Sequence, residues 1–181
     1  MNRFGMTLCL ACGMLLYAAT PPSARAEEPI KGAGDILQLL IPASGYAGTW
    51  LADDAEGRGQ FYRSSALSLA TTYALKYTID ERRPNGGDHS FPSGHTSAAF
   101  QGASFIQQRY GWRYGLPAYL GAAYVGWSRV ELEAHHPHDV FAGAAMGILS
   151  SYLFTTPFGE DFDAGLFYDG ERVGIQINWK W

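Results

Sequence analysis

The chain has 181 residues, with 13 lysines and arginines against 17 aspartates and glutamates and a formal net charge of −4 at pH 7. This acidic balance excludes the broad basic surface that general nucleic-acid binding needs. The length suits one domain with a real core. Both cysteines, Cys9 and Cys12, lie close to the amino terminus, so a disulfide framework is excluded for the rest of the chain.

Residues 1–26 are typical of a cleaved export signal. Arg3 supplies a basic start, residues 6–19 form an apolar run, and Ala24-Arg25-Ala26 ends in the small residues that signal peptidase prefers. We predict cleavage after Ala26 and a periplasmic or envelope-associated mature chain. An uncleaved signal is the alternative. Losing Arg3 and Arg25 leaves 11 basic and 17 acidic residues, a net charge of −6.

Helical patterns fill residues 27–155, which we predict to form one domain. After a lead-in at residues 27–34, Asp35 is placed to cap a first helix, which Pro42 bends or ends. Apolar residues then resume from Tyr46 to Ala52. Polar and helix-weakening residues make this stretch marginal as a bilayer span, so we expect a core helix.

The later helices are predicted at residues 60–78, 93–110, 116–127 and 137–154 from apolar spacing and from proline and glycine positions. Gly111 breaks the second of them, and Pro117 and Pro137 stand at helix starts, where proline is favoured. Turn-forming residues at 84–92 predict a loop. The expected fold is therefore all-α, a bundle of about five to six helices.

Residues 156–181 change character and predict a short strand or hairpin. From Val173 to Trp181, apolar and polar residues alternate with the period of a half-buried strand. Asp169-Gly170 is a turn signal that places a partner strand at residues 166–168. One hairpin cannot close a membrane barrel, so we expect it to pack on the helices, or to touch lipid or another subunit.

The side chains able to do chemistry are concentrated between Lys76 and Asp139. Bound phosphate needs several fixed donors, preferably an arginine fork and the free N–H groups of a helix start. Such a set is offered by Lys76, Arg83, Ser93, Gly94, His95 and Arg129. We therefore predict a phosphate-binding site.

Two histidines complete the chemistry of phosphoryl transfer. A neutral imidazole can attack phosphorus when its other ring nitrogen donates to a carboxylate, and His135 and Asp139 are four residues apart at a helix start. His95 could protonate the departing oxygen. The cations already neutralise developing charge, so we expect no metal and no other cofactor.

The spacing Lys76-x6-Arg83-Pro84, then Pro92-Ser93-Gly94-His95, then Ser128-Arg129-x5-His135-x3-Asp139 resembles the three-part signature of the type 2 phosphatidic acid phosphatases. That family shares a superfamily with the vanadium-dependent haloperoxidases. The resemblance implies a helical bundle with the site between helices. It implies His135 as the nucleophile that forms a phosphohistidine, Asp139 as its partner and His95 as the acid. The phosphate-binding positions would be Lys76, Arg83, Ser93, Gly94 and Arg129.

The function that we expect is that of an exported, metal-independent phosphatase acting on phosphomonoester or pyrophosphate groups. The substrate would be a lipid, such as an isoprenyl pyrophosphate, a phosphatidylglycerol phosphate or a lipid A headgroup, with a small soluble phosphate ester as the other possibility. Contact with a membrane surface through the first helix and the aromatic tail is part of this expectation.

Three alternatives stay open. The same cradle could hold vanadate in a haloperoxidase, although the chain is short for one. A noncatalytic envelope protein could bind phospholipid or metal. His89, His135, His136 and His138 could form a zinc or copper site, but we favour solvated histidines around Pro137.

Overall fold

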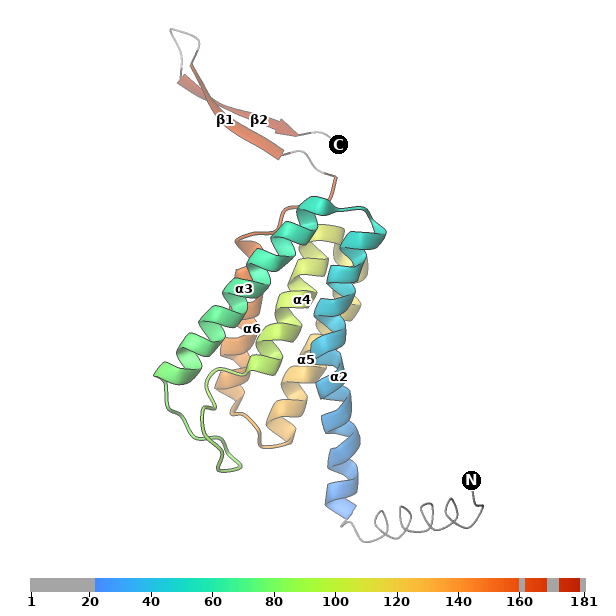
Figure 1. Ribbon diagram of the computed structural model, residues 1–181, viewed down its shortest axis with the longest axis vertical. Helices are drawn as coiled ribbons and strands as arrows, with labels where there is room; N and C mark the ends of the chain where they lie inside the picture. Colours follow the sequence, from blue (N-terminus) through green and yellow to red (C-terminus); the bar gives the residue numbers. More distant parts are fainter. Residues whose placement is uncertain (1–21, 160–161, 169–172, 180–181) are drawn as a thin grey trace, which may run out of the picture.

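The computed structural model describes residues 22–159, 162–168 and 173–179. Five helices fill residues 22–152: α2 (Pro22–Leu51), α3 (Ala55–Thr78), α4 (Gly94–Tyr110), α5 (Trp112–Glu131) and α6 (Pro137–Tyr152). They run alternately up and down the long axis of an upright bundle, in which α4 contacts all four of the others (Figure 1). The expected all-α class is confirmed. Residues 1–21 of the predicted export signal lie outside the described residues.

Helix α2 is longer than the sequence patterns predict. It covers residues 27–34, the expected lead-in, and continues through Asp35 and Pro42 to Leu51. Asp35 is therefore not a cap and Pro42 does not end the helix, whereas a bend at Pro42 stays a prediction. Close packing explains the tolerated proline, because a Cβ placed on Gly102 of α4 would lie 2.6 Å from Pro42 Cα. Tertiary contact here overrides the local cost of a proline in a helix.

Helix α5 also begins earlier than expected, at Trp112, which places Pro117 inside it. Gly111 ends α4 and begins α5 with a φ of +87°, a conformation that glycine adopts without strain. The chain therefore reverses within one residue. A Cβ on Gly115 would lie 2.4 Å from the Gln107 Cβ, so the two helices are in close contact directly after the turn.

The helix interfaces are rich in small and hydroxyl side chains. The Ser97 Oγ of α4 lies 2.8 Å from Ser68 Oγ and 2.9 Å from Thr72 Oγ1 of α3, and Gln101 Nε2 donates to Ser64 Oγ at 2.9 Å. The buried apolar core is small: Ile41, Ala99, Ala103, Phe105, Ile106, Ala122 and Val125. Because these buried hydroxyl groups hydrogen-bond one another across the helix interfaces, burying them costs little free energy.

Helices α4 and α6 form the most extensive helix–helix contact, and two glycines of α6 permit it. A Cβ on Gly143 would lie 2.5 Å from the Ser93 carbonyl oxygen, and one on Gly147 would lie 2.4 Å from the Ser97 carbonyl oxygen. Backbone therefore meets backbone along this interface. The starts of both helices are joined by a hydrogen bond from Ser93 N to Asp139 O at 3.0 Å.

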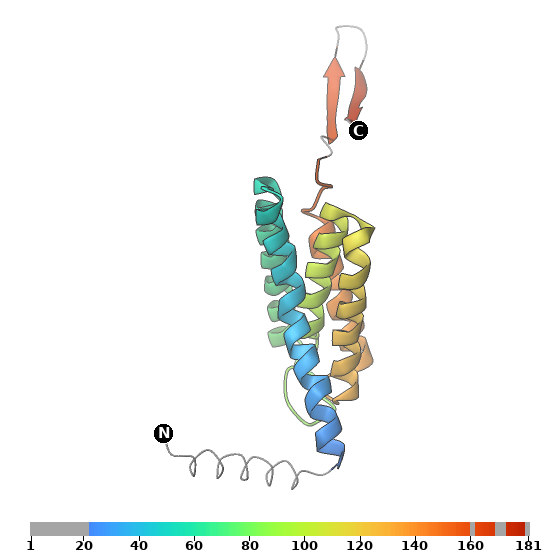
Figure 2. The same ribbon diagram turned by 90° about the vertical axis from the view of Figure 1, so that its right-hand side faces the viewer.

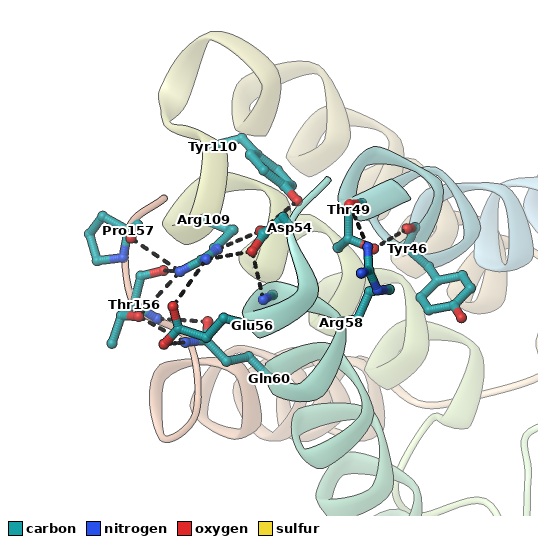
Figure 3. Close-up of polar contacts among 11 residues, drawn as sticks. Tyr46, Thr49, Asp54, Glu56, Arg58, Gln60, Arg109, Tyr110, Thr156 and Pro157 are labelled. Carbon is teal, nitrogen blue, oxygen red and sulfur yellow. Dashed lines mark hydrogen bonds and ion pairs between the residues drawn. The ribbon is translucent and has the colours of Figure 1, made fainter. Parts of the chain in front are cut away.

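A buried ion pair closes the opposite end of the bundle (Figure 3). Arg109 Nε and Nη2 donate to the two Asp54 oxygens at 2.7 and 2.6 Å, and both side chains are 3% exposed or less. Burial raises the pKa of Asp54, but hydrogen bonds from Arg109, Gly57 and Tyr110 outweigh it and hold that pKa below its usual value. Arg109 Nη1 also donates to Thr156 O at 2.8 Å, which attaches the segment after α6.

The tail contains two antiparallel strands, β1 (Phe162–Tyr168) and β2 (Val173–Trp179), in which Phe162 pairs with Trp179. They lie beyond the end of the bundle that holds the Asp54–Arg109 pair (Figures 1 and 2). The described strand residues contact each other and none of the helices, so packing on the helices, the first of the expected arrangements, is wrong. Contact of the tail with lipid or with another subunit stays a prediction. The predicted turn at Asp169-Gly170 lies outside the described residues.

Many large apolar side chains face outward on the helices. Examples are Leu39, Leu51, Leu120, Phe141 and Leu153, each at least 65% exposed. Within the described ranges, no helix combines the length and apolar character that crossing a bilayer requires.

We predict that Asp54→Asn destabilises the protein by on the order of 3–5 kcal/mol, because the buried Arg109 cation loses its buried counter-ion and keeps only the exposed Glu56, 3.4 Å away. Thermal unfolding followed by circular dichroism measures the effect. Asp53→Asn is the matched control, since Asp53 is exposed and its φ of +49° suits asparagine. Equal melting temperatures for the two variants would contradict the assigned role of the pair.

We predict that Gly143→Ala destabilises the bundle by about 1–3 kcal/mol, because the added methyl meets the α4 backbone, which cannot move aside cheaply. Gly32→Ala in α2 is the control, because nothing lies within 4 Å of the added methyl there. That change should be neutral or stabilise by up to about 1 kcal/mol. The same unfolding measurement tests both, and a Gly143→Ala protein as stable as the parent would exclude the close contact.

Candidate active site

All three sequence clusters lie at one end of the bundle. Lys76 is in the last turn of α3, Arg83 and Ser90 are in the loop before α4, and Arg129 is in the last turn of α5. Residues 93–95 begin α4 and residues 135–139 lead into α6. The end of α3, the start of α4, the end of α5 and the start of α6 all lie at the lower end of the bundle in Figure 1.

His135 and Asp139 lie side by side and are both buried. The His135 Nδ1 is 3.5 Å from Asp139 Oδ2, which is long for a hydrogen bond. Ser90 stands between them: its Oγ donates to Asp139 Oδ2 at 2.5 Å and lies 3.4 Å from His135 Nδ1. The backbone N–H of His136 donates to the same carboxylate oxygen at 2.9 Å. Ser90 was not among the predicted site residues, since nothing in its local sequence distinguishes it from a loop serine.

His135 is held neutral by its surroundings. Burial, the largest cause, and the positive charges of Arg83 and Lys76 together lower its pKa to about 4, and the nearby Asp139 offsets only part of this shift. The ring is therefore unprotonated at neutral pH. A neutral imidazole with a free ring nitrogen is the form able to act as a nucleophile.

His95 is paired with a carboxylate from α2. Its Nε2 lies 3.4 Å from Asp35 Oδ1, which also accepts a hydrogen bond from Arg129 Nη1 at 2.9 Å. Burial lowers the pKa of His95, Arg129 lowers it further, and Asp35 opposes both. Asp35 was predicted only as a helix cap. Because the expected helix began at that residue, the sequence contained no sign that it faces Arg129 across the bundle.

Arg129 is the most deeply buried of the predicted phosphate-binding cations. Its side chain is 5% exposed, and its Nη2 is buried without a hydrogen-bond partner among the described residues. Asp35 binds one arm of the fork and Ser128 Oγ accepts from Nε at 3.1 Å, which fixes the orientation of the guanidinium. The buried Nη2 is available for an anionic oxygen.

Lys76 and Arg83 are bound to the loop before α4. Lys76 Nζ donates to His89 O at 2.7 Å, and Arg83 Nε donates to Asp88 O at 3.1 Å. Burial lowers the pKa of Lys76, and the charge of Arg83 lowers it further. Arg83 also acts on both His95 and His135. Its charge therefore reaches both histidines of the site.

The start of α4 presents Ser93 and Gly94. The Ser93 side chain is fully buried, and its Oγ accepts a hydrogen bond from Thr96 Oγ1 at 2.9 Å. Its own proton is therefore left to donate. Gly94 has room for a Cβ on its protein side, with Thr72 Cγ2 the nearest atom at 3.7 Å. Close packing against the protein therefore does not explain the glycine.

Arg82, in contrast to Arg83, is exposed, and its carbonyl oxygen lies 3.1 Å from His136 Nε2. His89 is occupied by a contact between its Nδ1 and the Lys76 carbonyl oxygen at 3.1 Å. His136 caps α6: its side chain accepts from the Asp139 N–H. The four histidines considered as a zinc or copper site, His89, His135, His136 and His138, therefore do not form one.

Known proteins resemble this chain in sequence and in fold. A lipid A 1-phosphatase from Porphyromonas gingivalis is 33% identical over 159 residues, which cover 79% of this chain and 35% of the relative. A lipid A 4′-phosphatase from Helicobacter pylori is 28% identical over 171 residues, covering 82% of this chain and 83% of the relative. The chain thus spans about a third of the first relative and most of the second.

The crystal structure of LpxE from Aquifex aeolicus superposes with a TM-score of 0.63 at 21% identity, covering 80% of this chain and 92% of that one, and this similarity concerns the fold. Residues 85–161 match the PAP2 superfamily, a segment that contains the second and third clusters with His95, Arg129, His135 and Asp139. The family expected from the three clusters is thereby confirmed: the chain belongs to the PAP2 superfamily.

Proposed function

We propose that this protein is a phosphatase that removes phosphate from a lipid headgroup. The observation that carries the proposal is the state of His135, which is buried, paired with Asp139 and kept neutral by the charges of Arg83 and Lys76. Cations that disfavour a protonated histidine favour a bound phosphate. One arrangement therefore prepares the nucleophile and attracts its target.

In the proposed reaction, His135 Nε2 attacks phosphorus while the bond from phosphorus to the ester oxygen breaks. His95 gives its proton to that oxygen, and the product alcohol leaves. The resulting phosphohistidine is then hydrolysed by water, from which His95 takes a proton, and inorganic phosphate departs. Asp139 and Ser90 hold the Nδ1 side of the ring. Lys76, Arg83, Ser93, Gly94 and Arg129 bind the phosphate oxygens, which makes a metal unnecessary for charge neutralisation.

Asp35 has a supporting role in this scheme. A general acid must hold a proton when substrate is bound, yet burial and Arg129 both lower the pKa of His95. The Asp35 carboxylate acts in the opposite direction, and an arriving phosphate dianion would add to it. Asp35 is thus a positioning residue that favours the protonated form of His95 and orients Arg129.

The lipid preference rests on the surface and on the relatives. Outward-facing leucines, tryptophans and tyrosines suit contact with lipid rather than water. An apolar groove between α2, α4 and α5, lined among others by Leu40, Ile41, Ile106 and Pro117, could accommodate hydrocarbon. The names of the two relatives favour a lipid A headgroup among the phosphorylated lipids. Together with the predicted export signal, these features lead us to infer that the protein is exported and acts at the envelope membrane.

We predict that His135→Ala lowers phosphate release by at least about 1,000-fold, because it removes the nucleophile. Phosphate released from purified lipid A in mixed micelles is the measurement, with a chelator present to test metal independence. Arg82→Ala is the control and should retain activity, whereas Arg83→Ala should not. If His135→Ala keeps parental activity on lipid A and on a panel of other phosphorylated lipids and soluble esters, the proposed reaction is wrong.

We predict that Asp35→Asn shifts the alkaline limb of kcat/KM to lower pH. The carboxylate raises the pKa of His95, so removing its charge lowers that pKa, and the acid loses its proton at a lower pH. The acid limb reports His135, whose pKa is about 4, and should stay in place. A uniform loss of rate with both limbs unmoved would mean that Asp35 acts only in folding.

A further inference from the structure

A second cluster of ligating atoms lies on the outer side of Asp139. The donor atoms of Glu81, His138 and Asp139 all fall within 4.8 Å of one another. Glu81 Oε1 is 2.8 Å from His138 Nε2, which is 3.2 Å from Asp139 Oδ1. The three residues come from the loop before α4 and from the first turn of α6, so only the folded chain brings them together.

The two oxygens of Asp139 differ in what they contact. Oδ2 accepts hydrogen bonds from Ser90 Oγ and His136 N, whereas Oδ1 is buried and accepts none from the described residues. The residue as a whole is 0% exposed. A buried carboxylate oxygen without a donor is costly, and it is directed at the His138 and Glu81 atoms. A bound cation would satisfy it.

We propose that Glu81, His138 and Asp139 form a binding site for a divalent transition-metal ion such as Zn²⁺. One imidazole nitrogen with two carboxylate oxygens is a common zinc donor set, with bonds of about 2.0–2.2 Å. Tetrahedral ligands at that bond length lie roughly 3.3–3.5 Å apart. The two His138 spacings of 2.8 and 3.2 Å are shorter than this, and the Glu81 and Asp139 oxygens lie within 4.8 Å of each other, so a bound ion needs the exposed Glu81 and His138 side chains to shift.

The surroundings leave room for a fourth ligand and for access. The His138 side chain is 57% exposed and that of Glu81 is 31% exposed, so the ion can arrive from solvent and keep a water molecule. His136 stacks on His138, with ring centroids 5.2 Å apart, but its Nε2 is engaged with the Arg82 carbonyl oxygen. His136 is therefore a neighbour of the ion and not a ligand.

Occupation of this site would act on the nucleophile through Asp139. One carboxylate would bind the metal through Oδ1 while Oδ2 faces His135. A cation there withdraws negative charge from the partner of His135, which then stabilises a charged phosphohistidine less well. This step, unlike metal binding itself, rests on the proposed function. We therefore expect the ion to inhibit phosphate release.

The binding test uses the full-length metal-free protein titrated with ZnCl₂ in a calorimeter, and with CoCl₂ followed by visible absorption. We expect one equivalent to bind, with a rise in melting temperature. His138→Gln and Glu81→Gln should each weaken binding by at least about tenfold. His89→Asn is the control histidine and should bind as the parent does, since it lies outside the cluster. Absence of binding, or unchanged affinity in His138→Gln, overturns the proposal and leaves a hydrogen-bonded His138 as the account of the cluster.

The activity test measures phosphate release at increasing Zn²⁺ for the parent and for His138→Gln. We expect inhibition of the parent, reversal by a chelator, and resistance of the variant, whose activity without metal should match the parent's. Zn²⁺ binding without inhibition overturns the coupling through Asp139. A failure of the proposed function looks different, because phosphate release would then be independent of His135 while the calorimetric result is unaffected.

Discussion

The site depends on the direct contact between the backbones of α4 and α6. With no side chain at Gly143 or Gly147, the two helices approach until carbonyl oxygens of α4 touch the α6 backbone. This approach brings both helix starts to one place, where the Ser93 N–H binds the Asp139 carbonyl oxygen. The positive ends of two helix dipoles thus converge beside the cationic side chains, and the local field favours an anion even before those side chains contribute.

Polar and apolar side chains are distributed unusually in the bundle. Serine, threonine and glutamine side chains hydrogen-bond one another inside, whereas many leucine and aromatic side chains lie outside. Small polar residues at helix interfaces are typical of helices that associate in lipid, where apolar surface needs no burial. The mixture on each helix also keeps average hydropathy low. The exterior is therefore compatible with lipid, although no helix among the described residues is long and apolar enough to cross a bilayer.

The elements with local signals could be predicted from the sequence. The end of α4 follows from Gly111, the start of α6 from Pro137, and the three clusters follow from fixed spacings that identify the family. What could not be predicted depends on contacts between distant segments. Pro42 stays helical because α4 packs against it, and Asp35 reaches Arg129 because α2 packs against α5. Contacts of this kind produce no periodic hydrophobic pattern in the sequence of either segment.

The ion pair at the far end also decides the direction in which the chain leaves the bundle. Arg109 donates hydrogen bonds to the carbonyl oxygens of Thr156 and Pro157 (Figure 3). The Phe158 N–H donates back to Arg109 O at 2.8 Å. The polypeptide is thereby directed away from His135 by the full length of the helices. A fluorescent protein or affinity handle fused after the tail would leave the mouth of the phosphate site open, whereas one attached through the loop before α4 would obstruct it.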